Sequence, residues 1–191
     1  VLDKLRAKNG LNREIDHSLN EYFRLAGSLD IDQFKGVIED YSGLSKKLKI
    51  PESVFRSKIR QIQGIYSIVD HTRTLLFAIS DGMLPGNVGG GYNLRVILRR
   101  ALDFITELKL DVELDELAHW HAEFLRPMYP ELVEHEEDVK IILDVERKKY
   151  SNTQQRASRI VENLRKRSSN LGSDELVQLY GSEGITPEFL N

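Results

Sequence analysis

The sequence predicts an all-α fold, a helical bundle of two packed subdomains. Apolar residues recur at intervals of three and four along most of the chain, which is the spacing of a buried helix face. No segment shows sustained alternation of apolar and polar residues, the pattern of a half-buried strand. These two observations make a sheet-based fold the less favoured interpretation.

The composition is typical of a soluble globular protein: 191 residues, 40% hydrophobic and 30% charged. The net charge of -3 does not exclude a nucleic-acid partner, because a whole-chain sum hides local patches. The lack of cysteine excludes disulfides and thiolate zinc sites in this chain and fits a reducing compartment. We expect no signal peptide and no membrane span, since no apolar run approaches about 18 residues. The chain begins at Val1, without an initiator methionine, so we expect it to be a fragment of a longer protein.

The first half of the chain predicts two amphipathic helices. One has its apolar face at Ile31, Phe34, Ile38, Tyr41, Leu44 and Leu48. Pro51 is expected to be the first residue of the next helix, which is long and ends at Asp81 and Gly82. Its buried side is predicted to carry Phe55, Ile59, Ile62, Tyr66, Val69 and Leu76.

The second half predicts further helices and a turn-rich end. A third helix follows the glycines and is expected to bury Leu94, Ile97, Leu98, Ala101 and Ile105. Residues 113–126 form another, and Pro130 opens one that extends past Tyr150, where the letters YSNT could bend or break it. Ser173 is a natural N-cap for a short helix near the end.

Glycines between residues 82 and 91 first suggest a phosphate-binding loop, because glycine lets backbone N–H groups approach an anion. A Walker loop, however, ends in Gly-Lys-Ser/Thr, and a dinucleotide fingerprint follows a strand. Here the preceding HTRTLLFAIS continues a helical pattern, and no lysine follows the glycines. A nucleotide enzyme is therefore disfavoured.

Charge is divided sharply along the chain. Residues 111–138 are strongly acidic, whereas residues 140–167 are mainly basic. If the basic segment is helical, one face carries Lys148, Asn152, Arg156, Arg159, Asn163 and Lys166. We call this set the basic stripe, and it suits a phosphate backbone. A solvated face, or a pairing of the acidic helix with the basic one, is the more common explanation of an isolated charge run.

The glycine-rich turn has Asn87 at its tip, and Arg95, Arg99 and Arg100 follow on the next helix. This order can place an amide against a base edge while guanidinium groups bind the flanking phosphates. In the alternative, the glycines only make a tight connection and the arginines lie over the core. The residue types alone do not separate the two interpretations.

The segment VDHTRTLLFAISDGMLPGNVGGGYNLRVILRRAL, residues 69–102, resembles the region that follows the catalytic domain of alanyl-tRNA synthetases. The family pattern is close to A-D-H-x-R, then A-D-G-x-x-P-S/G-N-x-x-R/G-G-Y-x-L-R. The later ILDVERKKYSNTQQRASRIVENL and LVQLYGSEGITPE resemble the following elements of the same family, in its archaeal form. The resemblance covers most of the chain from about residue 61 onward.

The resemblance implies a region that binds the acceptor stem of tRNA-Ala and reads its G·U wobble pair. Asn87 matches one of the family's two base readers, and its carbonyl can accept a hydrogen bond from the guanine amine. The second reader is an aspartate in the family and Gly181 here, which leaves Asp174, Glu183 or a backbone group to replace it. The expected contacts to the tRNA backbone are made by Arg95, Arg99, Arg100, Lys148, Arg156, Arg159 and Lys166.

By the same resemblance, the parent enzyme attaches alanine to tRNA in the cytoplasm, using ATP and Mg, and carries a zinc-dependent editing domain. Its ATP-binding motifs are expected before Val1 and the editing domain after Asn191, so we expect no cofactor, no catalytic residue and no activity in this chain alone. We divide the chain into residues 1–60, a helical segment that joins the catalytic domain, and residues 61–191, the tRNA-binding part. Neither DNA nor a membrane is an expected partner.

Parts of the sequence also suggest two other functions. His119 and His121, with acids nearby, suggest a metal-dependent hydrolase, but residues two apart on a helix point in divergent directions. His71 and Trp120 are more typical of helix packing, and Asp70 and Arg73 could form an intrachain salt bridge. The second alternative is an all-helical interaction or scaffold domain without RNA specificity, whose basic stripe meets an acidic helix.

Overall fold

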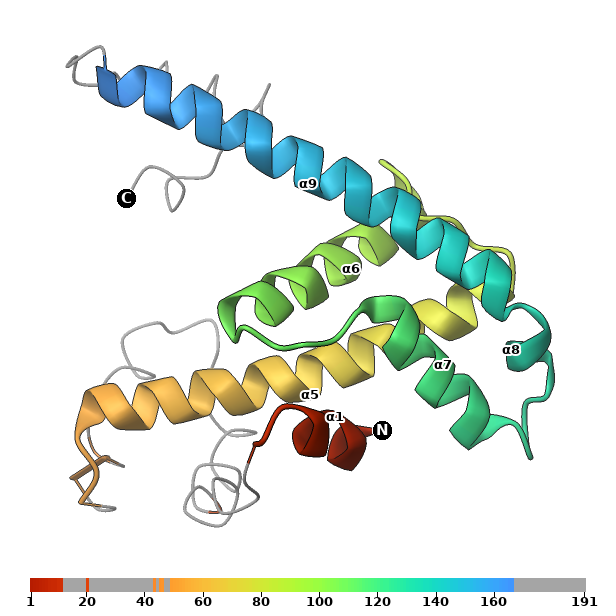
Figure 1. Cartoon of the computed structure of the whole chain (residues 1–191), viewed down its shortest axis with the longest axis horizontal. Coiled ribbons are helices and arrows are strands. Elements are labelled where there is room, and N and C mark those ends of the chain that lie inside the picture. The colour runs from red at the N-terminus through yellow and green to blue at the C-terminus, as the bar shows by residue number, and fades with distance from the viewer. Residues whose placement is uncertain (12–19, 21–42, 44, 47–48, 167–191) are drawn as a thin grey trace. The chain divides into compact units, whose positions relative to one another are not determined.

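The computed structural model describes residues 1–11, 20, 43, 45–46 and 49–166 (Figure 1). Every regular element in these residues is a helix, which confirms the predicted all-α class. Most of the predicted helix from Ile31 to Leu48, and the N-cap at Ser173, lie outside the described residues. No helix in the described ranges is long and apolar enough to cross a membrane.

The chain divides into two compact units, Val1–Lys140 and a second that begins at Ile141. The first contains α1 (Leu2–Lys8), α5 (Glu52–Ser80), α6 (Gly89–Glu107), α7 (Leu114–Leu125) and α8 (Glu131–Glu134). The long helix α9 (Glu136–Lys166) crosses the division. Our division after residue 60 stays a prediction, and α5 is continuous across it.

Helix α5 is the element on which the first unit is assembled, because α1, α6, α7 and α8 all contact it (Figure 1). Pro51 is its N-cap, so the helix begins one residue later than predicted. A helix that packs against several neighbours buries more than one stripe, and the fully buried Ile68 and Leu75 lie on a different side of α5 from Phe55. The placement of Tyr66 on the buried side was wrong: its side chain is 45% exposed, with the Arg6 guanidinium 5.6 Å from the ring centre.

Helix α6 packs closely on α5 at Gly64. A Cβ atom at this position would lie 2.7 Å from Leu108 Cδ1 and 2.8 Å from Phe104 Cδ1, so only glycine allows the observed approach. At the same end of the pair, the Arg60 guanidinium donates two hydrogen bonds of 2.8 Å to the Glu107 carboxylate. This bidentate bond lowers the pKa of Glu107. Leu94, Leu98 and Ala101 are buried as predicted, whereas Ile97 and Ile105 are only partly buried.

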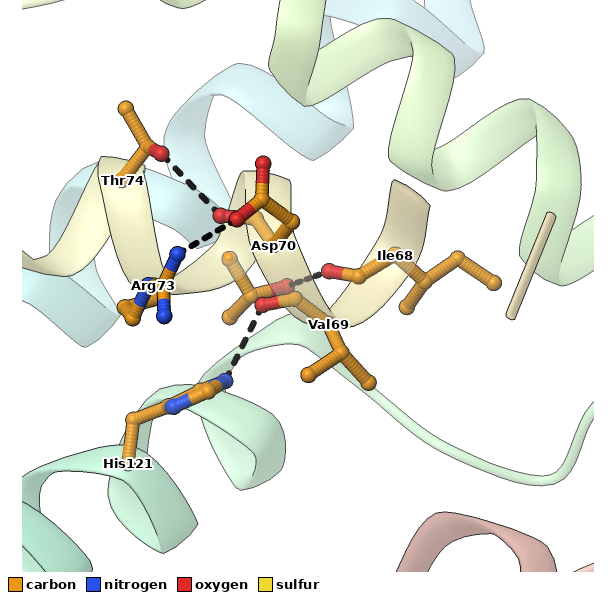
Figure 2. Close-up of polar contacts among 7 residues, drawn as sticks. Ile68, Val69, Asp70, Arg73, Thr74 and His121 are labelled. Atoms are coloured by element: carbon orange, nitrogen blue, oxygen red, sulfur yellow. Dashed lines mark hydrogen bonds and ion pairs between the residues drawn. The ribbon is translucent and has the colours of Figure 1, made fainter. Parts of the chain in front are cut away.

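Helix α7 is attached to α5 by a buried histidine (Figure 2). His121 Nε2 donates to the backbone carbonyl of Val69 over 3.0 Å, which identifies the neutral tautomer protonated at Nε2. Burial lowers the pKa of His121 to about 4, because it penalises the charged imidazolium. Leu117 and Trp120 of α7 share a core cluster with Ile68, so Trp120 is a packing residue as expected.

The α5 surface near His121 carries the polar contacts that the sequence suggested (Figure 2). Arg73 donates to the Asp70 carboxylate over 2.6 Å, which confirms an intrachain salt bridge for this pair. Both side chains are more than half exposed, so the pair adds little to stability. The Thr72 and Thr74 hydroxyls donate to the backbone carbonyls of Ile68 and Asp70, one turn earlier.

Pro130 caps the short α8, and α9 starts at Glu136, so the helix predicted to open at Pro130 is two helices. The segment Tyr150–Thr153 does not break α9, which is one helix to Lys166. The Thr153 hydroxyl donates a hydrogen bond to the Lys149 carbonyl, one turn earlier in the same helix. This bond satisfies the hydroxyl without interrupting the helix.

Gly64→Val should destabilise the chain by about 1 to 3 kcal/mol, because the added side chain meets Phe104 and Leu108 at a distance that requires α5 and α6 to separate. Urea denaturation followed by circular dichroism measures the change. The matched control is Ser57→Val on the exposed surface of α5, which should stay within about 0.5 kcal/mol of the wild type. Equal effects of the two substitutions would contradict the close α5–α6 contact.

His121 should make stability depend on pH. Its pKa of about 4 in the folded chain lies below the value near 6.5 in the unfolded chain, so the unfolded state binds more protons between these values. The stabilisation is complete above pH 6.5 and is lost as the pH falls towards 4. We expect the wild type to lose roughly 2 to 3 kcal/mol more than His121→Gln over this window. Urea denaturation at pH 4 to 8 measures the free energy of unfolding of both proteins. If this free energy changes with pH in the same way in the wild type and in His121→Gln, His121 does not titrate as inferred.

Candidate nucleic-acid interface

The turn between α5 and α6 begins with a Schellman ending of α5. Gly82 has a φ of 88°, a left-handed conformation that glycine adopts without strain. The N–H of Met83 donates to the Ala78 carbonyl and the N–H of Gly82 to the Ile79 carbonyl, both over 2.9 Å. These bonds satisfy the last carbonyls of α5 and turn the chain away from the helix axis.

The turn then folds back on the first residues of α6. Gly86 N–H donates to the Gly91 carbonyl over 2.8 Å. A Cβ atom on Gly91 would lie 2.6 Å from the Leu84 carbonyl oxygen and 3.0 Å from the Gly86 nitrogen, both of which belong to the backbone. Gly89, the first residue of α6, has a φ of 57°. The glycines therefore make a tight connection between α5 and α6, in which two backbone segments lie in close contact.

Asn87 lies exposed in this turn, and Arg95 of α6 binds it. One guanidinium nitrogen of Arg95, Nη1, donates to Asn87 Oδ1, and Nη2 donates to the Pro85 carbonyl oxygen over 3.3 Å. The amide oxygen has two lone pairs, of which Arg95 uses one. The sequence led us to expect Arg95 on the tRNA backbone; the structure brings its guanidinium to the loop.

The other two arginines of α6 occupy different environments. Arg99 is partly buried and Arg100 is exposed. The guanidinium of Arg100 is 5.9 Å from the centre of the Phe104 ring. Burial and the nearby charge of Arg100 lower the pKa of His71. His71 is therefore more readily neutral than a free imidazole, in keeping with a packing role.

Sequence reasoning missed the apolar surface around the turn. Five large apolar side chains of the turn and of the first two turns of α6 are between 43% and 82% exposed: Met83, Leu84, Val88, Tyr92 and Val96. Three of them, Met83, Leu84 and Val88, lie in the turn itself, where apolar residues among glycines and polar residues are a signal readable from the sequence. Exposed apolar groups near a binding loop are typical of a surface that a partner covers.

The basic stripe lies on α9, in the second unit. Lys148, Asn152, Arg156, Arg159 and Asn163 are all exposed, as its helical spacing predicted, and Lys166 is the last residue of the helix. Lys148 Nζ is 2.6 Å from the Asp144 carboxylate, and Arg147 donates to the same group over 2.8 Å. These two cations lower the pKa of Asp144. The stripe is thus a cationic surface with an acid at its start.

The remaining predicted site residues divide between two groups. Asp174, Gly181 and Glu183 lie outside the described residues, so the second base reader stays a prediction. His119 and His121 have separate partners, the Glu136 carboxylate at 2.6 Å for the first and the Val69 carbonyl for the second. Across the described part of the chain, no three His, Asp or Glu side chains are grouped as metal ligands.

The comparison with known proteins agrees with the motif of residues 69–102. The sequence profile of the family described as tRNA synthetases class II (A) matches residues 18–191. Similar proteins include the alanine-tRNA ligases of Cenarchaeum symbiosum (strain A), 38% identical over all of this chain and 21% of that protein, and of Pyrococcus furiosus, 32% identical over the same shares. That of Nitrosopumilus maritimus (strain SCM1) is 38% identical over 93% of this chain and 18% of its own length.

The chain therefore belongs to the class II alanyl-tRNA synthetase family, in its archaeal form. It spans about a fifth of the length of the curated relatives it matches.

Gly91→Ala should open the turn, because its methyl group meets two backbone atoms that cannot rotate away. We expect a loss of about 1 to 3 kcal/mol in stability and faster hydrogen exchange at Gly86 N–H, which loses its acceptor at Gly91. Amide exchange measured by NMR reads this proton directly. Gly90→Ala is the matched control, since its Cβ would meet only the flexible Met83 side chain, at 3.3 Å. Equal exchange at Gly86 in both variants would contradict the close turn.

Proposed function

We propose that this chain is the part of an alanine-tRNA ligase that binds the acceptor stem of tRNA-Ala and reads its G·U wobble pair. The observation that carries the proposal is the exposed position of Asn87 in a turn whose backbone is fixed by the contact between Gly86 and Gly91. Helix α6, which carries three arginines, follows this turn directly. A reader of base edges needs a polar side chain that reaches outward from a rigid support.

The chemistry of the wobble pair suits such a reader. In A-form RNA the minor groove is wide and shallow, so a side chain on a protruding turn can reach the base edges there. The wobble geometry leaves the guanine exocyclic amine without its usual partner, and an amide group can hydrogen-bond to the pair. The second lone pair of Asn87 Oδ1 and its Nδ2 group are both available for this contact.

Arginine and lysine side chains supply the affinity in this proposal. Arg99 and Arg100 follow the turn on α6, and Lys148, Arg156, Arg159 and Lys166 lie along α9. Each cation that replaces a counterion on a phosphate contributes to binding and makes it sensitive to salt. The exposed apolar residues Leu84, Val88 and Tyr92 would cover sugar faces beside the readout.

The activity of the whole protein belongs to the same proposal. The parent would activate alanine with ATP and Mg and transfer it to the end of tRNA-Ala in the cytoplasm, with its zinc site in an editing domain. We assign these cofactors to other parts of the parent protein. The sequence of this chain has no cysteine that could serve as a zinc ligand.

A scaffold domain without RNA specificity is the second candidate. The exposed apolar residues Phe124 and Met128, 72% and 68% exposed, favour a protein partner at that end of the first unit. An apolar interface of this kind is far less sensitive to salt than phosphate contacts are.

The chain should bind a hairpin of the tRNA-Ala acceptor stem more tightly than the same hairpin with G·C in place of G·U. Because phosphate contacts release counterions, affinity for both should fall by about 100-fold between roughly 50 and 200 mM salt. Asn87→Ala should lose the G·U preference, worth about 1 to 3 kcal/mol, and keep the salt dependence. Fluorescence anisotropy with labelled hairpins measures all three quantities.

The outcomes of this titration separate the candidates. Salt-sensitive binding without a G·U preference would keep the cations of α6 and those of α9 as RNA-binding groups but remove the base-reading role of Asn87. No binding at either salt concentration would leave the scaffold function.

A further inference from the structure

The side chain that presents the readout is itself held by a second residue. Asn87 is exposed in a turn, where an amide side chain would ordinarily sample several rotamers. In this chain the Arg95 guanidinium donates to its Oδ1. A group that is ordered before binding spends less of its interaction energy on losing rotamer freedom.

Arg95 holds two points of the turn at once. Its Nη1 binds Asn87 and its Nη2 binds the carbonyl oxygen of Pro85, so the flat guanidinium spans Gly86. Two donors in a fixed fork can do this, whereas the single ammonium of a lysine cannot hold both acceptors in the same geometry. Arg95 is eight residues from Asn87, and the contact exists because Gly86 N–H and the Gly91 carbonyl fold the turn back on α6.

The contact also fixes the orientation of the amide group, with its oxygen at the guanidinium and the second lone pair of that oxygen left for the guanine amine. An arginine side chain carries N–H donors and no acceptor, so the Asn87 group that faces it must be the oxygen. The amide nitrogen is then directed away from Arg95. Without this donor the two ends of the amide could exchange places by rotation about one bond.

We propose that Arg95 is a positioning residue that sets the base-pair specificity of this surface by holding the Asn87 amide in one rotamer and one orientation. The inference rests on the proposed function of Asn87 as a base reader. It differs from the expectation that Arg95 binds the tRNA backbone. A backbone contact would raise affinity for every stem equally, whereas positioning raises the preference for one pair.

Arg95→Lys in the full 191-residue chain separates the two roles, because lysine keeps the positive charge and loses the fork. With the G·U and G·C hairpins, we expect the preference to fall to within about twofold of that of Asn87→Ala, while the salt dependence stays unchanged. The double variant Arg95→Lys with Asn87→Ala should show no further loss of preference, since Arg95 acts through Asn87. Additive losses, or a preference retained in Arg95→Lys, would overturn the proposal.

Arg100→Ala is the matched control on the same helix. Its exposed guanidinium lies near the Phe104 ring, so its removal should lower affinity for both hairpins by the same factor and leave the preference intact. A loss of preference in this variant as large as that in Arg95→Lys would show that specificity depends on helix charge in general, and would overturn the positioning role.

A measurement without RNA distinguishes failure of this inference from failure of the proposed function. The side-chain amide of Asn87 gives an NMR signal whose heteronuclear relaxation reports its mobility on the ps–ns timescale. We expect a rigid amide in the wild type and a mobile one in Arg95→Lys. Equal mobility in both would overturn the positioning of Asn87 by Arg95. If the wild-type amide is rigid but the chain shows no G·U preference, Arg95 does hold Asn87 and the proposed base-reading function is wrong.

Discussion

The contact between the Leu84 carbonyl and Gly91, where no Cβ atom fits, is the constraint on which the candidate interface depends. This contact lets the chain reverse direction between α5 and α6. The hydrogen bond from Gly86 N–H to the Gly91 carbonyl closes the turn. The same reversal brings α6 back along α5, where Gly64 permits a second close approach at the far end of the pair. Two glycine contacts thus set both the packing of the helices and the position of Asn87.

The helices of the first unit could be predicted because each buries an apolar face against α5, and burial leaves a regular spacing in the sequence. The end of α5 and the extent of α7 followed from this spacing and from Gly82. The spacing failed at Tyr66, because a helix with several neighbours has several buried stripes, and sequence periodicity cannot say which one an aromatic residue joins. The continuous α9 was equally hidden, since YSNT is compatible with both a helix and a turn.

The residues of the candidate site can be named from the sequence, but their contacts cannot. Asn87 and the arginines of α6 stand in a recognisable motif, and the family follows from it. The bond from Arg95 to Asn87 could not be found in this way, because it joins a turn to a helix and depends on the backbone path between them. The hydrogen bond from His121 to the Val69 carbonyl could not be predicted either. The sequence around His119 and His121 does not indicate which carbonyl the His121 side chain will reach.

Helix α9 separates its charges along its length, and this has a consequence for how an RNA would approach. Glu136, Glu137 and Asp138 stand in its first turn, where the helix dipole favours acids, and the cations come later. The acids of the first turn repel a polyanion and the later cations attract it, so the electrostatic field orients the polyanion as well as attracting it. Encounter would then be oriented before any contact forms, and this orientation would weaken as salt shortens the range of the field.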